Sequence, residues 1–336
     1  MRPFLKPSFH KRLLVVAIGP HNLRNNVLLA PMAGVTDVPF RALTWRFGVG
    51  HVISEMVGSK AELWDTDKSR LRRGTVEGIR PVAIQIAGGD PEIIAEAARR
   101  HWQDGADIVD INFGCPAKKV CRKAAGSSLL GDAGLVRDII QAAVAAVPIP
   151  ITIKMRTGLT PVARNGVEIA QIAEGEGVAA ISVHGRTRAC KFEGAVEFDT
   201  IAAIKAAVSV PVFANGDIDS PALAADVLAR TGADGVMIGR AALGAPWLPG
   251  QIAGESGPLS VAEKLAVVRE HVKAGHDYYG EPGVKIMRKH VQWYLEKMTE
   301  LGDESWRRTL ISSFNQLKEA EAQLDHLHEL APRLAA

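Results

Sequence analysis

The sequence predicts an α/β fold, a (β/α)8 barrel followed by a smaller all-helical domain. Three observations indicate this. Eight short apolar segments lie between residues 27 and 238, and helical patterns separate most of them. The segments are nearly continuous hydrophobic runs, as expected of parallel strands buried on both faces. Only amphipathic helical patterns follow Pro246-Trp247. A doubly wound open sheet is the main alternative, but the first strand–helix turn has no G-x-G-x-x-G fingerprint.

Hydrophobic patterns and capping residues predict the individual strands and helices. The expected strands are 27–31, 51–55, 82–86, 107–112, 149–155, 179–184, 210–214 and 234–238. Helix starts are indicated by an N-cap at Thr36 or Asp37 and by the pairs Asp90-Pro91 and Ser220-Pro221. Further helices are expected over 132–146, 162–174, 197–207, 260–278, 283–299 and 303–330. The basic stretch 58–78 is predicted to be a solvated loop.

Length and composition limit the class of protein. The 336 residues, 47% hydrophobic and 23% charged, fit a soluble globular chain with one large and one smaller domain. We expect an N-terminal extension over 1–18, the barrel over 19–252 and the helical domain over 255–332. The apolar run 13–18 is shorter than a signal-peptide core, so an added strand or a surface segment is expected there.

Charge and cysteine content exclude several kinds of protein. A net charge of +3 does not by itself indicate a nucleic-acid partner, so any basic patch must be local. Three irregularly spaced cysteines are too few for a disulfide framework or a structural zinc site, which predicts a cytoplasmic protein without a metal. No apolar run reaches membrane-spanning length, and nothing indicates an obligate protein partner.

One cysteine lies in a stiff turn directly after a predicted strand. Gly114 permits unusual backbone angles, and Pro116 fixes the chain just beyond Cys115. The thiol could serve as a nucleophile, a proton donor, a metal ligand or plain core filler. Several cationic residues follow Cys115 within a few positions. They would favour the thiolate form of Cys115 unless their side chains face a different binding partner.

Polar residues follow the other predicted strands, where a barrel carries its active site. Each has an ordinary structural explanation when taken alone, but together they share one face of the barrel. Lys154 lies within an apolar strand, and burying an unpaired ammonium is costly, so it should meet an anion or a carbonyl-rich ligand. Glycine-plus-cation turns after the last two strands are typical of phosphate sites. These features suggest a flavin mononucleotide (FMN) site as a hypothesis.

Six motifs make the resemblance specific. They are PMAGVTDVPFR (31–41), NFGCPAKKV (112–120), AGSSLL (125–130), VHGRTR (183–188), ANGDI (214–218) and GRAALG (239–244). In this order they resemble the tRNA-dihydrouridine synthases, most closely the bacterial B-type branch, over roughly residues 19–320.

The resemblance implies an FMN- and NADPH- (or NADH-) dependent reduction of a tRNA D-loop uridine to 5,6-dihydrouridine. Cys115 would protonate C5 after hydride addition at C6, and the helical domain would help to hold tRNA. The implied FMN ligands are Pro31, Met32, Ala33, Gln85, Lys154, His184, Asn215, Gly216, Asp217, Gly239 and Arg240. Candidate tRNA contacts are Asn112, Lys118, Lys119, Arg122, Arg186, Arg188, Lys285, Arg288 and Lys289.

Two other functions remain open from the sequence. One is a flavin-dependent oxidoreductase of a free pyrimidine, similar to dihydroorotate dehydrogenases, although the helical domain and the cationic segments disfavour it. The other is a non-catalytic RNA-binding or regulatory protein on the same fold. Retention of Cys115, Lys154 and His184 together argues against the second.

Overall fold

The barrel predicted from the sequence is confirmed. The computed structural model describes residues 16–60, 62, 64, 66–121 and 125–330, without the side chains of residues 68, 118 and 119. Among these residues, nine parallel strand segments form one sheet in the order β4-β3-β11-β10-β9-β8-β7-β6-β5. Their bounds are β3 (Val27–Leu29), β4 (His51–Val52), β5 (Val57–Gly58), β6 (Ala83–Ala87), β7 (Ile108–Phe113), β8 (Ile151–Arg156), β9 (Ala180–His184), β10 (Val212–Asn215) and β11 (Gly235–Ile238).

The sheet closes on itself through its second strand. β4 and β5 are two parts of this strand, because β4 pairs with β3 whereas β5 pairs with β6. A parallel bridge between Ile53 and Ala83 joins the two sides between them. Eight barrel strands therefore result, as predicted, and their carboxyl ends meet at one rim.

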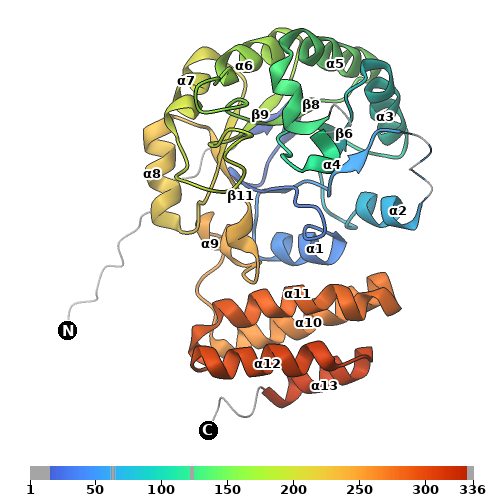
Figure 1. Cartoon of the computed structure of the whole chain (residues 1–336), viewed down its shortest axis with the longest axis vertical. Coiled ribbons are helices and arrows are strands. Elements are labelled where there is room, and N and C mark those ends of the chain that lie inside the picture. The colour runs from blue at the N-terminus through green and yellow to red at the C-terminus, as the bar shows by residue number, and fades with distance from the viewer. Residues whose placement is uncertain (1–15, 61, 63, 65, 122–124, 331–336) are drawn as a thin grey trace, which may run out of the picture.

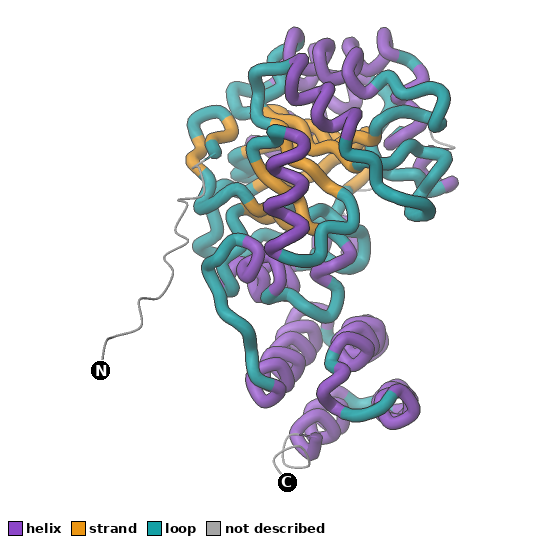
Figure 2. Tube along the Cα trace, turned by 90° about the vertical axis from the view of Figure 1, so that its left-hand side faces the viewer, coloured by secondary structure: helices purple, strands orange, loops and turns teal. Residues whose placement is uncertain are grey.

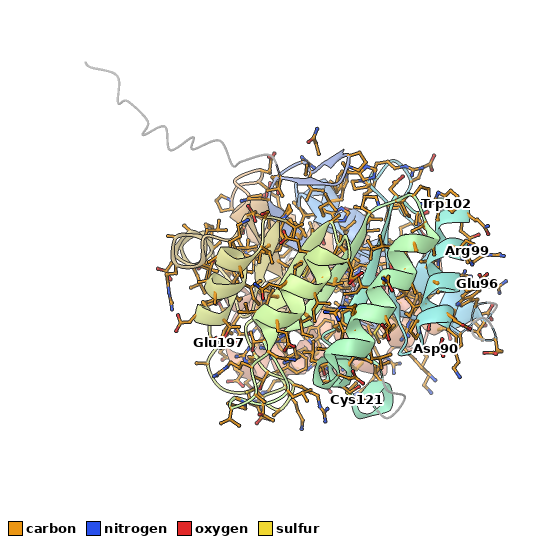
Figure 3. The ribbon with its side chains drawn as sticks, turned by 90° about the horizontal axis from the view of Figure 1, so that it is seen from above. Asp90, Glu96, Arg99, Trp102, Cys121 and Glu197 are labelled. Carbon is orange, nitrogen blue, oxygen red and sulfur yellow. The ribbon has the colours of Figure 1, made fainter. Side chains whose placement is uncertain are left out.

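Helices surround the barrel on its outer side (Figure 1). They are α1 (Val38–Arg46), α2 (Asp67–Arg73), α3 (Pro91–Gln103), α5 (Ala133–Ala146), α6 (Gly166–Gly175), α7 (Asp199–Ala207) and α8 (Pro221–Thr231). Side-chain caps from Asp37, Asp90, Asp132 and Ser220 accept the N–H three residues further on in their helices. The outer face of α3 carries Glu96, Arg99 and Trp102 (Figure 3).

Two features of the barrel region add to what the sequence predicted. α6 begins at Gly166 rather than near 162, because Leu159 N–H bonds Ala163 O and forms a turn first. The N-terminal hairpin β1 (Ala17–Ile18) and β2 (His21–Asn22) buries Val16, Ile18 and Leu23 against inward-facing strand residues. The predicted boundary between residues 18 and 19 therefore falls inside this hairpin; residues 1–15 lie outside the described part.

The basic stretch 58–78 is not simply a solvated loop. It contains α2, capped by Thr66, and the buried Trp64, whose Nε1 donates to Gly58 O at 3.1 Å. Arg73 donates to Trp64 O at 3.0 Å. The expectation failed because one apolar anchor and a helix cap within a charged run are enough to fold it onto the barrel.

The C-terminal domain is helical, as predicted, and lies beyond α1 and α9 (Leu248–Ile252) at one end of the molecule (Figures 1 and 2). Its helices are α10 (Val261–Tyr279), α11 (Glu281–Lys297), α12 (Glu304–Gln316) and α13 (Ala320–Leu330). The single helix expected over 303–330 is two, because Leu317 adopts an extended conformation at the end of α12. None of the described helices is both long and apolar enough to span a membrane.

Candidate active site

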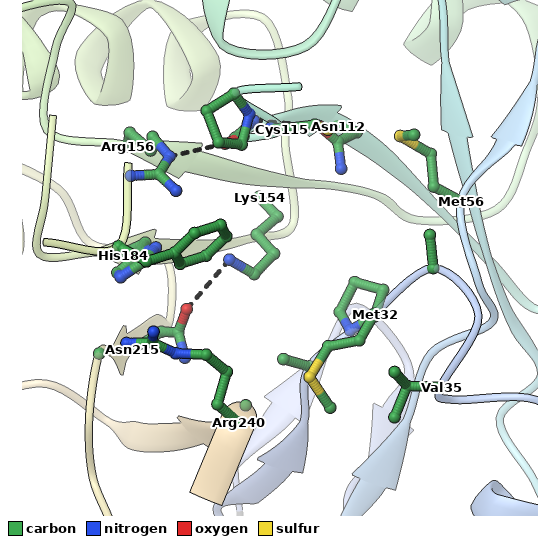
Figure 4. Close-up of a pocket in the computed structure, with 18 of the residues that line it drawn as sticks. Met32, Val35, Met56, Asn112, Cys115, Lys154, Arg156, His184, Asn215 and Arg240 are labelled. Carbon is green, nitrogen blue, oxygen red and sulfur yellow. Dashed lines mark hydrogen bonds between the residues drawn. The ribbon is translucent and has the colours of Figure 1, made fainter. Parts of the chain in front are cut away.

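A cavity of about 550 Å³ opens at the carboxyl ends of the barrel strands. It brings together residues that lie more than 200 positions apart in the chain, such as Pro31 and Arg240 (Figure 4). Its lining includes every predicted FMN ligand together with the two residues expected to act on substrate: Pro31, Met32, Ala33, Gln85, Asn112, Cys115, Lys154, His184, Asn215, Gly216, Asp217, Gly239 and Arg240. The strand-end positions therefore form one site.

Lys154 has one hydrogen-bond partner that the structure describes. Its Nζ donates to Asn215 Oδ1 at 3.0 Å, and Asn215 Nδ2 donates to Met237 O at 2.7 Å, which orients the amide. Burial lowers the pKa of Lys154 to about 8; Arg156 adds to the lowering and Asp110 opposes it. An ammonium with free donors therefore lines the cavity and suits an electron-rich group of a ligand.

A buried network that the sequence did not reveal orients Gln85. Asp110 accepts Gln85 Nε2 and Thr152 Oγ1, each at 2.7 Å. Gln85 Oε1 in turn accepts Asn112 Nδ2 at 2.9 Å. Burial raises the pKa of Asp110. The sequence signal for this network is an acidic residue, Asp110, within the otherwise apolar run 108–113.

The Cys115 side chain is partly buried at the cavity wall. Cys115 N–H donates to Asn112 Oδ1 at 2.9 Å, and Cys115 O accepts Ser127 N–H at 3.1 Å and Ser127 Oγ at 2.8 Å. Burial raises the pKa of the Cys115 thiol, although Arg156 and Lys154 act in the opposite direction. The thiol form, which can donate a proton, is therefore favoured over the thiolate.

The turn after β10 carries an acidic residue in an unusual conformation. Asp217 has a φ of 47°, and its carboxylate accepts hydrogen bonds from Arg186 and Arg240. These hydrogen bonds lower the pKa of Asp217, and the bond from Arg186 has the largest effect. At Gly216, where φ is 138°, a Cβ would lie 2.7 Å from Val196 Cγ1. The turn therefore brings its own backbone at Gly216 and the Arg240 side chain together at the edge of the cavity.

Arg186 does not lie where an RNA contact requires. It is 4% exposed, and its guanidinium donates to Glu193 O, Gly194 O and Asp217. The expected tRNA contact through Arg186 is not supported by this geometry; the side chain holds the rim of the cavity instead. The sequence could not separate it from Arg188, which is exposed.

Arg156 and Phe192 are cavity residues that the sequence did not single out. Arg156 donates to Gly114 O at 2.7 Å and to Thr187 O at 3.0 Å, so it joins the Cys115 loop to the loop after β9. The Phe192 ring lies 5.3 Å from the Arg156 guanidinium and 5.0 Å from that of Arg240, and it is 49% exposed. Arg156 directly follows the predicted strand 149–155, and this position is a sequence signal for a cavity residue; Phe192 has no such signal.

The remaining tRNA candidates differ in how they are presented. Lys285 is exposed, whereas Arg288 is partly buried and donates to Leu317 O at 2.9 Å. Lys289 is also partly buried and points toward Gly34 on the barrel. The side chains of Lys118 and Lys119, and Arg122 as a whole, lie outside the described residues.

A closed (β/α)8 barrel with such a cavity at the carboxyl ends of its strands defines a barrel enzyme. The family model for dihydrouridine synthase matches residues 28–332. A tRNA-dihydrouridine synthase B from Pseudomonas syringae pv. tomato is 52% identical over 94% of both chains. The enzyme of the same name from Escherichia coli is 49% identical over 92% of this chain and 97% of its own.

The chain therefore belongs to the dihydrouridine synthase family, and the resemblance to the B-type branch is confirmed. Solved structures add support for the fold alone. A 2-naphthoyl-CoA reductase complex has a TM-score of 0.54 at 13% identity, covering 71% of this chain and 51% of that one. Histamine dehydrogenase from Rhizobium sp. 4-9 has a TM-score of 0.52 at 14% identity, covering 78% and 51%.

Proposed function

We propose that this protein reduces the C5=C6 bond of a uridine in the tRNA D-loop to 5,6-dihydrouridine. FMN is the proposed cofactor, NADPH the proposed reductant and the cytoplasm the proposed location. The observation that carries the proposal is the convergence of all eleven expected FMN ligands and Cys115 on one cavity in a member of this family.

The cavity residues fit FMN chemically. A volume of about 550 Å³ lies within the range of small-molecule and cofactor sites. The free donors of Lys154 suit the pyrimidine end of a flavin, where negative charge develops on reduction. The glycine turns at Gly216 and Gly239, with Arg240, suit its phosphate. When bound, FMN supplies hydride for C6 of the uracil ring, after reduction by a nicotinamide nucleotide.

Cys115 supplies the second half of the reaction. Hydride addition at C6 moves the electron pair of the C5=C6 bond onto the conjugated carbonyl. The resulting enolate takes a proton at C5 from Cys115 Sγ, which leaves a thiolate that solvent reprotonates. A raised thiol pKa suits this role, because only the protonated form can donate. The hydrogen bond that the Cys115 N–H donates to Asn112 Oδ1 holds Cys115 in place.

The RNA must present the base outside its stack, which costs a few kcal/mol unless the nucleotide begins in a loop. A flexible D-loop meets this requirement. Exposed Lys285 on α11 and exposed Arg188 in the loop after β9 are the proposed phosphate contacts among the described side chains. Lys118, Lys119 and Arg122 remain proposals from the sequence.

One experiment tests the proposal and its alternatives. The purified protein is examined for flavin absorbance, and dihydrouridine is mapped by mass spectrometry in tRNA from a deletion strain before and after the gene is restored. We expect a yellow protein and restored D-loop dihydrouridine. A colourless protein would favour the non-catalytic alternative. Turnover of free uracil or dihydroorotate, with unchanged tRNA, would favour the free-pyrimidine oxidoreductase.

A further inference from the structure

The segment between β3 and α1, residues 31–36, forms one wall of the cavity and is here called the flavin loop. Pro31, Met32, Ala33 and Val35 line the cavity from it. Within the loop, Met32 N–H donates to Thr36 Oγ1 at 2.8 Å, and Val35 N–H donates to Met32 O at 3.0 Å. Gly34, at its tip, has a φ of 76°. The shape of this wall therefore depends on what holds Gly34.

Glu55 holds the tip of the loop from the barrel side. It follows β4, is 2% exposed, and its Oε1 accepts the Gly34 N–H. Arg72 of α2 brings its Nε to 3.5 Å from the same oxygen. A buried carboxylate is costly unless it is paired and hydrogen-bonded, so positive charge near Glu55 stabilises its contact with the loop.

Lys289 reaches the same point from the helical domain. A Cβ placed on Gly34 would lie 3.3 Å from Lys289 Nζ, so the ammonium lies directly over the loop tip. No hydrogen bond or ion pair joins Nζ to any residue that the structure describes. Burial lowers the pKa of Lys289, and the carboxylates of Asp37 and Glu55 oppose this. The charge of Lys289 thus acts on Glu55 through space, without a direct hydrogen bond or ion pair between the two side chains.

A second link joins the same domain to the end of the loop. Tyr279, the last residue of α10, donates its hydroxyl to Asp37 Oδ2 at 2.8 Å. Asp37 Oδ1 accepts Phe40 N–H at 2.9 Å and so begins α1 directly after the loop. The helical domain therefore touches the flavin loop at its tip and at its exit.

We propose that Glu55 and Lys289 are positioning residues for the cofactor: Lys289, with Arg72, supplies the positive charge that holds the Glu55 carboxylate against the Gly34 N–H, and this fixes the flavin loop in its binding shape. This inference rests on the proposed FMN function. It gives the helical domain a role at the cofactor site in addition to its proposed contact with tRNA.

The test measures FMN affinity of the full-length apoprotein by fluorescence titration. Lys289→Met and Glu55→Gln should each raise the FMN dissociation constant about tenfold or more, since hydrogen bonds to charged groups are worth about 1.5–3 kcal/mol. Lys289→Arg should recover most of the affinity. Lys285→Met, exposed one turn earlier on α11, is the matched control and should weaken tRNA binding while FMN affinity stays unchanged.

Thermal melting of the apoproteins separates positioning from folding, because a positioning role predicts weaker FMN binding at an unchanged melting temperature. A Lys289→Met protein that binds FMN normally but loses tRNA affinity, as Lys285→Met does, would overturn the inference. An equal loss of melting temperature in Lys289→Met and Lys289→Arg would also overturn it. If wild-type protein binds no FMN, the proposed function itself fails.

Discussion

The amide oxygen of Asn112 accepts the backbone N–H of Cys115 at 2.9 Å and that of Gly114 at 3.1 Å. The amide nitrogen of the same side chain donates to Gln85. One asparagine at the end of β7 therefore fixes the backbone of the candidate proton donor and belongs to the network that begins at buried Asp110. The first role of Asn112 is to position the Cys115 loop, which leaves one N–H for a substrate carbonyl.

Replacement of Cys115 by alanine should remove turnover without removing the cofactor. We expect normal FMN content and normal flavin reduction by NADPH, but a loss of dihydrouridine formation of roughly 10²-fold or more, as for a general acid. Stopped-flow absorbance and tRNA mass spectrometry separate the two steps. Cys121→Ala, outside the cavity lining, is the control and should stay active. Full activity of Cys115→Ala would disprove the donor role.

Replacement of Lys154 by alanine should act at the earlier step. Without the ammonium that faces the cavity, reduced flavin loses its positive neighbour, so we expect weaker FMN retention or slower reduction by NADPH. Flavin content after gel filtration and reduction rates provide the measurement. Lys273→Ala on the exposed surface of α10 is the control. Unchanged flavin content and kinetics in Lys154→Ala would contradict the assignment.

Asp37 should make stability depend on pH. Burial raises its pKa from 3.8 to about 6, although Phe40 N–H and Tyr279 hydroxyl oppose this. A raised folded-state pKa contributes stability below 3.8 that is lost as pH rises through about 6, so the ionised group costs about 3 kcal/mol at pH 8.

Asp37→Asn keeps a good helix cap and removes this charge. We therefore expect the variant to melt at a higher temperature than wild type at pH 8, with the difference shrinking toward pH 4. Because the two proteins share all other titratable groups, the effects of those groups on stability cancel when the two are compared. A variant that is less stable at pH 8, with a difference independent of pH, would show that the Tyr279 bond outweighs the cost of the buried charge.

Lys285 should contribute to tRNA affinity through charge alone. Charge reversal to glutamate should weaken binding at low salt and lower the slope of log affinity against log salt by roughly 1, as expected for one phosphate contact. Filter binding at several salt concentrations measures this. Lys273→Glu, on the neighbouring helix α10, is the control for net charge. An unchanged slope for Lys285→Glu would remove α11 from the proposed RNA surface.

The sequence predicted the barrel well because its strands are apolar runs with clear helix caps between them. It also predicted the cavity lining, since strand ends in a barrel converge whatever their separation along the chain. It could not predict contacts made between side chains of distant elements. Glu55 was assigned only to a strand, and Lys289 only to the candidate tRNA contacts, because nothing local indicates that they meet at Gly34.

The junction of barrel and helical domain offers a stability test at Gly244, which ends the GRAALG motif. Its φ is 66°, and a Cβ there would lie 2.2 Å from the backbone oxygen of Trp293 in α11. Gly254 is a matched control, because its φ of 72° imposes the same conformational cost while a Cβ would meet nothing within 4 Å. Replacement by alanine at either position costs roughly 1–2 kcal/mol from the left-handed conformation.

The difference between the two variants therefore isolates the contact across the junction. Gly244→Ala should destabilise the protein by clearly more than Gly254→Ala, because backbone cannot move aside as the end of a flexible side chain can. It should also weaken FMN binding, since Leu243 and Ala241 beside it line the cavity. Urea unfolding and FMN titration of both variants provide the measurements. Equal stability of the two would mean that α11 shifts away from the barrel at little cost.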